Sequence, residues 1–379
     1  MFKRRVTSQI NIGNVLIGGN AQISVQSMTK TDTRDVKATV NQIDAIAEAG
    51  GDIVRCAVPD MEAAVALKDI VKKSKLPVVA DIHFHYKLAL ESLKNGVDCL
   101  RLNPGNIRDK SKVQEIVKEA KIRQVPIRIG VNFGSLPPVG KIGVFGGLSR
   151  HADKVNELPK PAEAKDGEYT VVDHMVDTGL WEISILESLD FDLIKISLKA
   201  FDIQTTVESY RTLSKMVPYP MHLGITEAGT AKSGSIRSAI GIGALLYEGI
   251  GDTIRVSLSD EPEEEVYTGI EILKALNLRK AGAVLVACPS CGRADVDIRE
   301  LANKVDSLLK DTKTPLKIAV MGCEVNGPGE AKDADIGIAA GVGKAVIFKK
   351  GEKARVVQES EMLNALMEEI KQHEDSILK

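Results

Sequence analysis

Three of the five cysteines in this 379-residue chain lie close together toward its C-terminal end. Cys288 and Cys291 form a Cys-x-x-Cys turn, and Cys323 follows on a separate Gly-rich turn. The first turn places two thiolates on one ion or cluster, and the third cysteine supplies a further corner of a tetrahedron. No fourth cysteine or nearby histidine follows, so the next candidate donor is a carboxylate, Glu324 or Glu330.

This donor set favours one kind of metal site over others. A structural zinc ion is usually enclosed by four Cys or His ligands, whereas thiolates also select iron–sulfur clusters. Three thiolates and one replaceable oxygen donor favour a reactive iron–sulfur cluster with a corner that substrate can reach. Spacing alone leaves a zinc site and a redox dithiol open. Cys56 and Cys99 lie in apolar, strand-like runs, and we expect both to be buried structural thiols.

Cationic and hydroxyl side chains recur at the ends of apolar runs earlier in the chain. They alternate with apolar residues, so those of one run share one face of a predicted strand. The set comprises Arg55; Arg101 and Asn103; Arg128 and Asn132; Lys195, Ser197 and Lys199; and Arg255, Ser257 and Ser259.

Cations from five strands that meet in one cavity require a polyanion, because an unpaired buried charge costs several kcal/mol. Arginine forks match phosphate oxygens and serine hydroxyls add donors, so the pattern predicts a diphosphate site. A structural ion-pair network is the alternative interpretation, with Asp52, Asp81, Asp98, Asp252 and Glu227 as partners. Glu227 also follows a predicted strand, where it is either a helix N-cap residue or a general acid.

A strand-then-helix rhythm must position these side chains. Eight apolar strands are predicted, and helices between them end near glycines, as C-caps do. The predicted strands are Ile23–Ser27, Ile53–Ala57, Val78–Asp81, Cys99–Asn103, Ile127–Val131, Leu193–Ser197, Met221–Ile225 and Thr253–Val256. Eight β/α units are what a TIM barrel needs, with its active site at the carboxyl ends of the strands. A doubly wound sheet is the alternative, but it more often has five or six strands.

Three other stretches complete the predicted organisation. Val6–Gly19 reads as a short hairpin ahead of the barrel. The interval Phe133–Val171 breaks the rhythm: its Pro- and Lys-rich part is interpreted as a surface excursion, and Asn132–Ser135 as a functional loop. From about Ala281 a smaller α+β domain carries the cysteine turns on loops that follow strands. The predicted domains are therefore 1–278, a barrel that binds a diphosphate, and 279–379, which holds the cluster.

Composition excludes several classes of protein. No apolar run reaches the roughly 18 residues of a membrane span, and the first residues lack the apolar region of a secretory signal. With few cysteines, clustered for metal, we expect a cytoplasmic protein. A formal net charge of −2 and 4% aromatic residues argue against binding of nucleic acid.

Five motifs resemble the bacterial 4-hydroxy-3-methylbut-2-enyl diphosphate synthase family. They are Gln26-Ser27-Met28-Thr29-x-Thr31-x-Thr33, Leu102-Asn103-Pro104-Gly105-Asn106, Thr226-Glu227-Ala228-Gly229, Cys288-Pro289-Ser290-Cys291-Gly292-Arg293 and Gly322-Cys323-x-Val325-Asn326-Gly327-Pro328-Gly329-Glu330. The resemblance covers nearly the whole chain. It implies a TIM barrel followed by a cluster domain similar to sulfite reductase modules. It also implies a [4Fe–4S] cluster held by Cys288, Cys291, Cys323 and Glu330.

The resemblance further implies an oxidoreductase of isoprenoid precursor synthesis. Its reaction is the two-electron reductive ring opening and dehydration of 2-C-methyl-D-erythritol 2,4-cyclodiphosphate. By similarity, the diphosphate is clamped by Arg55, Arg101, Arg128, Asn132, Lys199, Arg255 and Ser257. Glu227 and Asn326 handle protons or the departing hydroxyl, beside the exchangeable ligand Glu330. The family works as a homodimer in which the cluster domain of one subunit closes the barrel of the other, with reduced flavodoxin or ferredoxin as electron donor.

From the residues alone, two other classes compete with this interpretation. One is an electron-transfer or binding module with a structural zinc site, which has no need of strand-end cations. The other is a pterin-type barrel enzyme that carries a structural zinc domain, for which tetrahedral zinc is expected.

Overall fold

The structure is a computed structural model that divides into two compact units, Met1–Arg279 and Lys280–Lys379. It describes residues 3–82, 85–107, 109–138, 169–289, 298–309, 312, 314–322, 329 and 332–377. Each unit has its own buried apolar core. In the described ranges no helix has the length and apolar character to cross a membrane.

Eight parallel strands form the centre of the first unit. They run in the order β8-β7-β6-β5-β4-β3-β10-β9. A parallel bridge between Ile196 of β8 and Met221, just before β9, joins the two ends of this order. The strands are β3 (Ser24–Met28), β4 (Ile53–Ala57), β5 (Val78–Asp81), β6 (Cys99–Arg101), β7 (Ile127–Asn132), β8 (Ile194–Lys199), β9 (His222–Leu223) and β10 (Thr253–Ile254).

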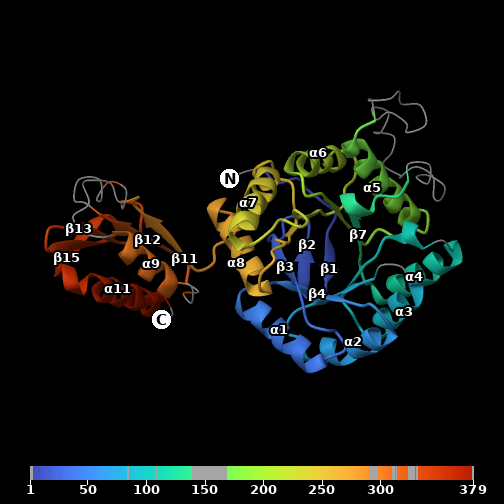
Figure 1. Cartoon of the computed structure of the whole chain (residues 1–379), viewed down its shortest axis with the longest axis horizontal. Coiled ribbons are helices and arrows are strands. Elements are labelled where there is room, and N and C mark those ends of the chain that lie inside the picture. Colours follow the sequence, from blue (N-terminus) through green and yellow to red (C-terminus); the bar gives the residue numbers. More distant parts are fainter. Residues whose placement is uncertain are drawn as a thin grey trace. The chain divides into compact units, whose positions relative to one another are not determined.

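A helix follows each of these strands, and the eight helices ring the strands (Figure 1). They are α1 (Val36–Glu48), α2 (Met61–Lys73), α3 (Tyr86–Lys94), α4 (Lys110–Arg123), α5 (Val171–Glu187), α6 (Ile203–Ser214), α7 (Ala231–Tyr247) and α8 (Pro262–Ala275). Aspartates cap the N-termini of several: Asp35, Asp60, Asp109 and Asp202 each accept a backbone N–H of the first turn. The predicted TIM (β/α)₈ barrel is thus confirmed, and a doubly wound sheet is excluded because the strand order closes on itself.

The alternation in the strands explains which side chains enter the barrel. Leu100, Ile129 and Leu198 belong to the apolar core between the strands and the helices. Their neighbours in sequence therefore turn to the barrel axis, because successive side chains of a strand point to opposite faces. The expected inward set of polar residues follows from this packing.

The predicted N-terminal hairpin is also present. β1 (Ile10–Ile12) and β2 (Val15–Ile17) pair in antiparallel fashion around a turn at Gly13 and Asn14. Ile10, Ile12 and Ile17 form a buried cluster with Ile53, Val79 and Cys99 of the barrel strands. The hairpin therefore closes the end of the barrel at which the strands begin, and leaves the carboxyl ends of the strands for a site.

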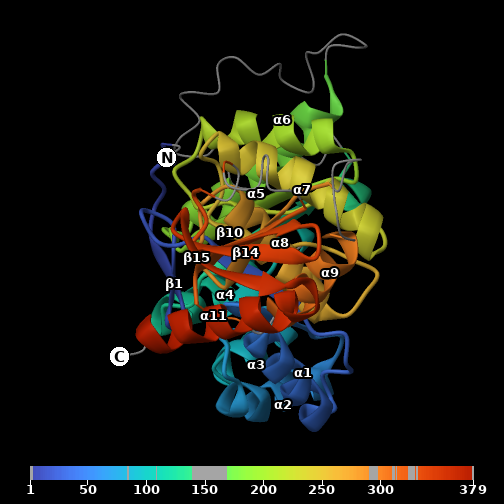
Figure 2. The ribbon, with the colours of Figure 1, turned by 90° about the vertical axis from the view of Figure 1, so that its left-hand side faces the viewer.

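In its described residues, the second unit is a five-stranded sheet packed with the helices α9 and α11. Its strands are β11 (Ala283–Ala287), β12 (Leu316–Met321), β13 (Ile336–Gly341), β14 (Lys344–Lys349) and β15 (Glu352–Gln358), in this order. The first three are parallel, and the last two pairings are antiparallel. Apolar side chains of α9 (Ile298–Leu309) and α11 (Met362–Ile377) share one core with the sheet, and Figure 2 shows both helices beside it.

Candidate functional site

The strand-end cations lie inside the barrel and share its carboxyl end. Neighbouring strands place Arg101 opposite Asp81 and Arg128, and Asn132 opposite Lys199. Arg101, Arg128 and Lys199 are almost fully buried, at 5%, 3% and 7% exposure. Charged side chains are rarely buried without partners, so their contacts decide what the arrangement is for.

Asp81 links two of these cations. Its carboxylate lies 3.5 Å from Nε of Arg55 and 3.4 Å from Nη1 of Arg101. The Arg55 guanidinium also contacts the sulfur of Met28 on β3, at 2.9 Å from Nη2. The two arginines are therefore held on either side of one carboxylate at the end of β5.

Gly130 of β7 makes room for Arg101. A Cβ at this position would lie 2.7 Å from Nε of Arg101, so a larger residue would displace the guanidinium. The Gly130 carbonyl accepts hydrogen bonds from Nη2 of Arg101 and Nδ2 of Asn103, both at 3.0 Å. Asn103 also accepts the Gly130 N–H at 2.8 Å, so this amide side chain bridges the ends of β6 and β7.

Arg255 and Lys199 meet on the other side of the barrel. Nη1 of Arg255 donates to the Ser257 hydroxyl at 2.8 Å. A Cβ at Gly224 would lie 2.5 Å from both Nζ of Lys199 and the Arg255 carbonyl oxygen. A glycine at the end of β9 is thus required for the close approach of the lysine.

The cations repel one another through this interior. Burial, followed by the charges of Arg55 and Arg101, lowers the pKa of Arg128 to about 9. Burial also lowers the pKa of Lys199 well below its ordinary value, with Arg128 and Arg255 as the next causes. Nε and Nη1 of Arg128 have no hydrogen-bond partner within the described residues. The unliganded site is therefore electrostatically unfavourable and suited to an anion.

The binding partners of the carboxylates test the alternative of a purely structural ion-pair network. Asp52 pairs with Arg279, Asp252 pairs with Arg4, and Asp98 accepts the Val78 N–H. None of these three has a recorded ion pair with the strand-end arginines in the described residues, whereas Asp81 has two. The cations of this interior are Arg55, Arg101, Arg128, Lys195, Lys199 and Arg255. Asp81 and Glu265 form ion pairs with members of this set in the described residues, and the charges of Glu182 and Asp252 act on Arg101 and Lys195.

Glu227 and Asn132 lie at the same end of the barrel. Asn132 is half-buried as the last residue of β7, and Glu227 is exposed in the loop after β9. The backbone of Glu227 has a positive φ of 53°, a left-handed conformation that a non-glycine residue rarely adopts. Such strain concentrates at functional loops. The loop is held by a bond from the Ser259 N–H to the Gly229 carbonyl, at 2.9 Å.

In the second unit, the two strands that precede the cysteine turns are neighbours. β11 and β12 are adjacent parallel strands, with Ala287 opposite Val320, so the turns that follow them begin at the same sheet edge. The Gly322 N–H donates to Sγ of Cys288 at 3.2 Å. Such bonds tune a cluster thiolate. Cys56 and Cys99 are buried and free, as expected.

Several predicted residues lie outside the described part of the chain. They are Cys291, Cys323, Asn326 and Glu330, together with most of the Pro- and Lys-rich segment. No group of three metal-ligating side chains occurs within the residues that are described. Cys288 is thus the member of the predicted ligand set whose surroundings are known.

Sequence reasoning missed two buried carboxylates on the helices. Glu265 of α8 is 1% exposed and pairs with Arg255 at 3.1 Å. Glu182 of α5 accepts the Gly105 N–H at 2.7 Å, and burial raises its pKa to about 7. Both stand within runs of otherwise ordinary helix, so no local signal distinguishes them. His222 is buried as well, with its pKa well below the ordinary value because of burial and nearby cations.

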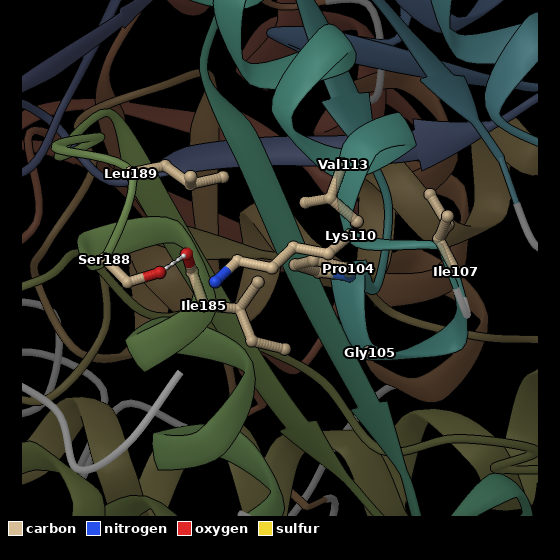
Figure 3. A pocket seen from close by; sticks show the side chains of 8 residues that line it. All are labelled: Pro104, Gly105, Ile107, Lys110, Val113, Ile185, Ser188 and Leu189. Carbon is tan, nitrogen blue, oxygen red and sulfur yellow. Dashed lines mark hydrogen bonds between the residues drawn. The ribbon is translucent and has the colours of Figure 1, made fainter. Parts of the chain in front are cut away.

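A small pocket lies beside the Pro104–Asn106 turn, away from these cations. It is lined mainly by apolar residues, including Pro104, Ile107, Val113, Ile185 and Leu189. Figure 3 shows Lys110 extending across it toward the end of α5. We assign it no role in the chemistry, because its lining offers one cation and no convergent set of polar groups.

Models of one protein family match both units of the chain. A model described as the GcpE TIM-barrel domain matches residues 7–270, and one described as the GcpE protein C-terminal domain matches residues 284–372. A dihydropteroate synthase structure from Stenotrophomonas maltophilia aligns with a TM-score of 0.48 and 15% identity, over 72% of this chain and 97% of that one.

Curated relatives match nearly end to end. A protein of Dehalococcoides mccartyi is 54% identical over 98% of this chain and 99% of its own length. Proteins of Thermodesulfovibrio yellowstonii (50% identical, 98% of this chain and all of the relative) and Clostridium acetobutylicum (49%, 97% and 99%) follow. All three are named 4-hydroxy-3-methylbut-2-en-1-yl diphosphate synthase (flavodoxin). Together with the cation-lined barrel, these matches show that the chain belongs to the GcpE family of 4-hydroxy-3-methylbut-2-en-1-yl diphosphate synthases.

Proposed function

We propose that the chain catalyses the reductive ring opening of 2-C-methyl-D-erythritol 2,4-cyclodiphosphate to 4-hydroxy-3-methylbut-2-enyl diphosphate. Two electrons and two protons enter, the ring C–O bond to phosphate breaks, and one water leaves. The observation that carries the proposal is the crowding of cations in the described barrel interior, where Arg128 and Lys199 are buried and neighbouring positive charges lower the pKa of each. A cyclic diphosphate supplies the negative charge that this interior requires.

Each clamp residue has a defined task in this proposal. Arg55 and Arg101, held by Asp81, present forked donors to one phosphate. Arg128 offers Nε and Nη1, which lack partners within the described residues. Lys199, Arg255, Ser257 and Asn132 complete the set from β7, β8 and the end of β10. The arrangement fixes the ring by its charged end and leaves the carbon skeleton to be reduced.

The residues present fit a [4Fe–4S] cluster. Cys288, Cys291, Cys323 and Glu330 would hold it, and Cys288 already receives the backbone N–H that favours a thiolate. When bound, the cluster supplies the electrons for the reduction. Glu227, an exposed carboxylate on a strained loop of the barrel mouth, is suited to give a proton to the departing hydroxyl. Asn326 would share that task from the second cysteine turn.

The relatives' names support reduced flavodoxin as electron donor, and ferredoxin is the alternative donor. We further propose a homodimer and a cytoplasmic location. Free thiols at Cys56, Cys99 and Cys288 accord with a compartment in which cysteines stay reduced. Sedimentation of the anaerobic protein tests the dimer, and a monomer at working concentration would contradict it.

One experiment tests the function and its two competitors together. The protein is purified without oxygen, assayed for iron, sulfide and zinc, and mixed with the cyclic diphosphate and reduced flavodoxin. We expect four irons and four sulfides per chain, as a [4Fe–4S] cluster requires, together with formation of the linear diphosphate. Zinc alone would favour the pterin-type enzyme or the zinc-stapled module. Cys288→Ser is the matched control, because it should lose the cluster while the barrel still binds diphosphate.

A further inference from the structure

A buried carboxylate on α8 contacts the clamp from outside the barrel wall. Glu265 is 1% exposed and accepts hydrogen bonds from three different groups. Nη2 of Arg255 lies 3.1 and 3.3 Å from its two oxygens, the Leu258 N–H lies at 3.0 Å, and the Ser27 hydroxyl lies at 2.9 Å. A single side chain thus ties together β3, the end of β10 and the segment that follows it.

These contacts restrict Arg255 strongly. Nη2 of its guanidinium is held by Glu265, and Nη1 by the Ser257 hydroxyl at 2.8 Å. Nε has no hydrogen-bond partner within the described residues. Because the guanidinium is planar, two fixed nitrogens set the orientation of the third. The Leu258 bond also holds the backbone just after Ser257, so both members of the pair are placed by one carboxylate.

The charge of Glu265 matters as well as its shape. Arg255 stands among cations, and its pKa is lowered first by burial, whereas Glu265 is the largest influence that raises it. A glutamine of the same size would keep one acceptor oxygen. Its NH₂ group would face one of the three donors and repel it, and no negative charge would offset the guanidinium.

We propose that Glu265 is a positioning residue for diphosphate binding, which acts through Arg255 and Ser257 without touching the substrate. The inference rests on the proposed function, because it assigns Arg255 and Ser257 to the clamp. Ser27 serves the same assembly from the opposite side of the carboxylate: it follows Gln26 in the first motif and turns outward to α8.

The test measures binding of inorganic pyrophosphate and of the cyclic diphosphate to the anaerobic holoenzyme by calorimetry, together with KM and kcat. Glu265→Gln should weaken both ligands about tenfold or more and raise KM more than it lowers kcat, since it removes one charge-assisted contact of the clamp. Glu265→Asp, which keeps the carboxylate, should recover part of the affinity. Glu264→Gln, an exposed neighbour on the same helix, is the matched control and should bind as the wild type does.

A double-variant cycle separates positioning from general stability. In an Arg255→Ala/Ser257→Ala background, Glu265→Gln should weaken pyrophosphate binding by less than about twofold, because both groups through which it acts are gone. Additive losses would overturn the inference, as would wild-type affinity in Glu265→Gln. If Glu265→Gln does not fold, the Glu265→Asp variant and its own cycle with Arg255→Ala/Ser257→Ala decide in the same way. Wild-type protein that binds neither ligand would instead refute the proposed function.

Discussion

Arg128 gives the sharpest test that the barrel interior is built for an anion. The side chain is 3% exposed, and burial with the neighbouring charges lowers its pKa from the ordinary value of an arginine to about 9. At roughly 1.36 kcal/mol for each pH unit, keeping this charge in the unliganded fold costs on the order of 5 kcal/mol. The pKa in the folded state is the lower one, so the cost is fully present below about pH 9 and is relieved as pH rises above that value.

We therefore examine Arg128→Met, which removes the charge and keeps much of the side-chain length. The electrostatic gain is offset by lost packing of the guanidinium, which costs roughly 1–3 kcal/mol for an imperfect core exchange. The unliganded variant should be as stable as the wild type at pH 7, or more stable by about 1–3 kcal/mol. Replacement of buried charges by apolar groups of similar volume has this sign in other proteins.

The assay uses the single tryptophan of the chain. Trp181 lies on α5 and is 6% exposed, so its fluorescence reports unfolding of the barrel itself. Urea unfolding is followed with and without pyrophosphate, which should stabilise the wild type by about 2.7 kcal/mol at a hundredfold excess over Kd. Pyrophosphate should stabilise the Arg128→Met variant much less than it stabilises the wild type.

A matched control changes a cation that has no such role. Arg123 of α4 forms an exposed pair with Glu119 at 3.2 Å, and such pairs contribute about 0–1 kcal/mol. Arg123→Met should leave both the stability and the pyrophosphate shift nearly unchanged. Our reasoning is refuted if Arg128→Met is several kcal/mol less stable without ligand, or if it retains the full shift.

Three further predictions follow from single side chains. Gly224→Ala places a Cβ 2.5 Å from Nζ of Lys199, so we expect a loss of about 1–3 kcal/mol in urea unfolding and weaker pyrophosphate binding; unchanged binding would show that the lysine has room to move. Burial raises the pKa of Glu182 to about 7 from 4.5, so the folded wild type loses stability as pH rises through this interval. The free energy of unfolding of Glu182→Gln, relative to that of the wild type, should therefore rise by about 3 kcal/mol between pH 4.5 and 8. Parallel curves of stability against pH would contradict this. Glu330→Ala should leave a labile or inactive cluster, measured by iron content and turnover under anaerobic conditions, and wild-type turnover would remove Glu330 from the ligand set.

Local sequence patterns were sufficient to predict the strands named below and the polar side chains that point into the barrel. β4 and β5 begin and end where their apolar runs predict, because a run bounded by turn residues is the signal of a buried strand. The alternation around Arg101, Arg128 and Lys199 predicted which side chains enter the barrel, because the side-chain period of a strand is two residues. The N-terminal hairpin was likewise predicted from its glycine turn.

The sequence does not predict which residues far apart in the chain form ion pairs with one another. Asp52, Asp81, Asp98 and Asp252 look alike in sequence, yet of these four Asp81 is the one recorded with Arg55 and Arg101. Which carboxylate pairs with which arginine depends on strand register and on which end of the barrel each occupies, and both arise only when the sheet closes.

By itself, the sequence determined the alternation of strands and helices, the inward row of cations and the two cysteine turns, since each depends on neighbours a few residues apart. The tertiary structure decided that Glu265 of α8 holds Arg255, that Glu182 of α5 holds Gly105, and that Gly224 admits Lys199. Those contacts join segments far apart in the chain, and hydrogen-bond geometry tolerates errors of only a few tenths of an ångström. Local preference does not carry information at that distance or with that accuracy.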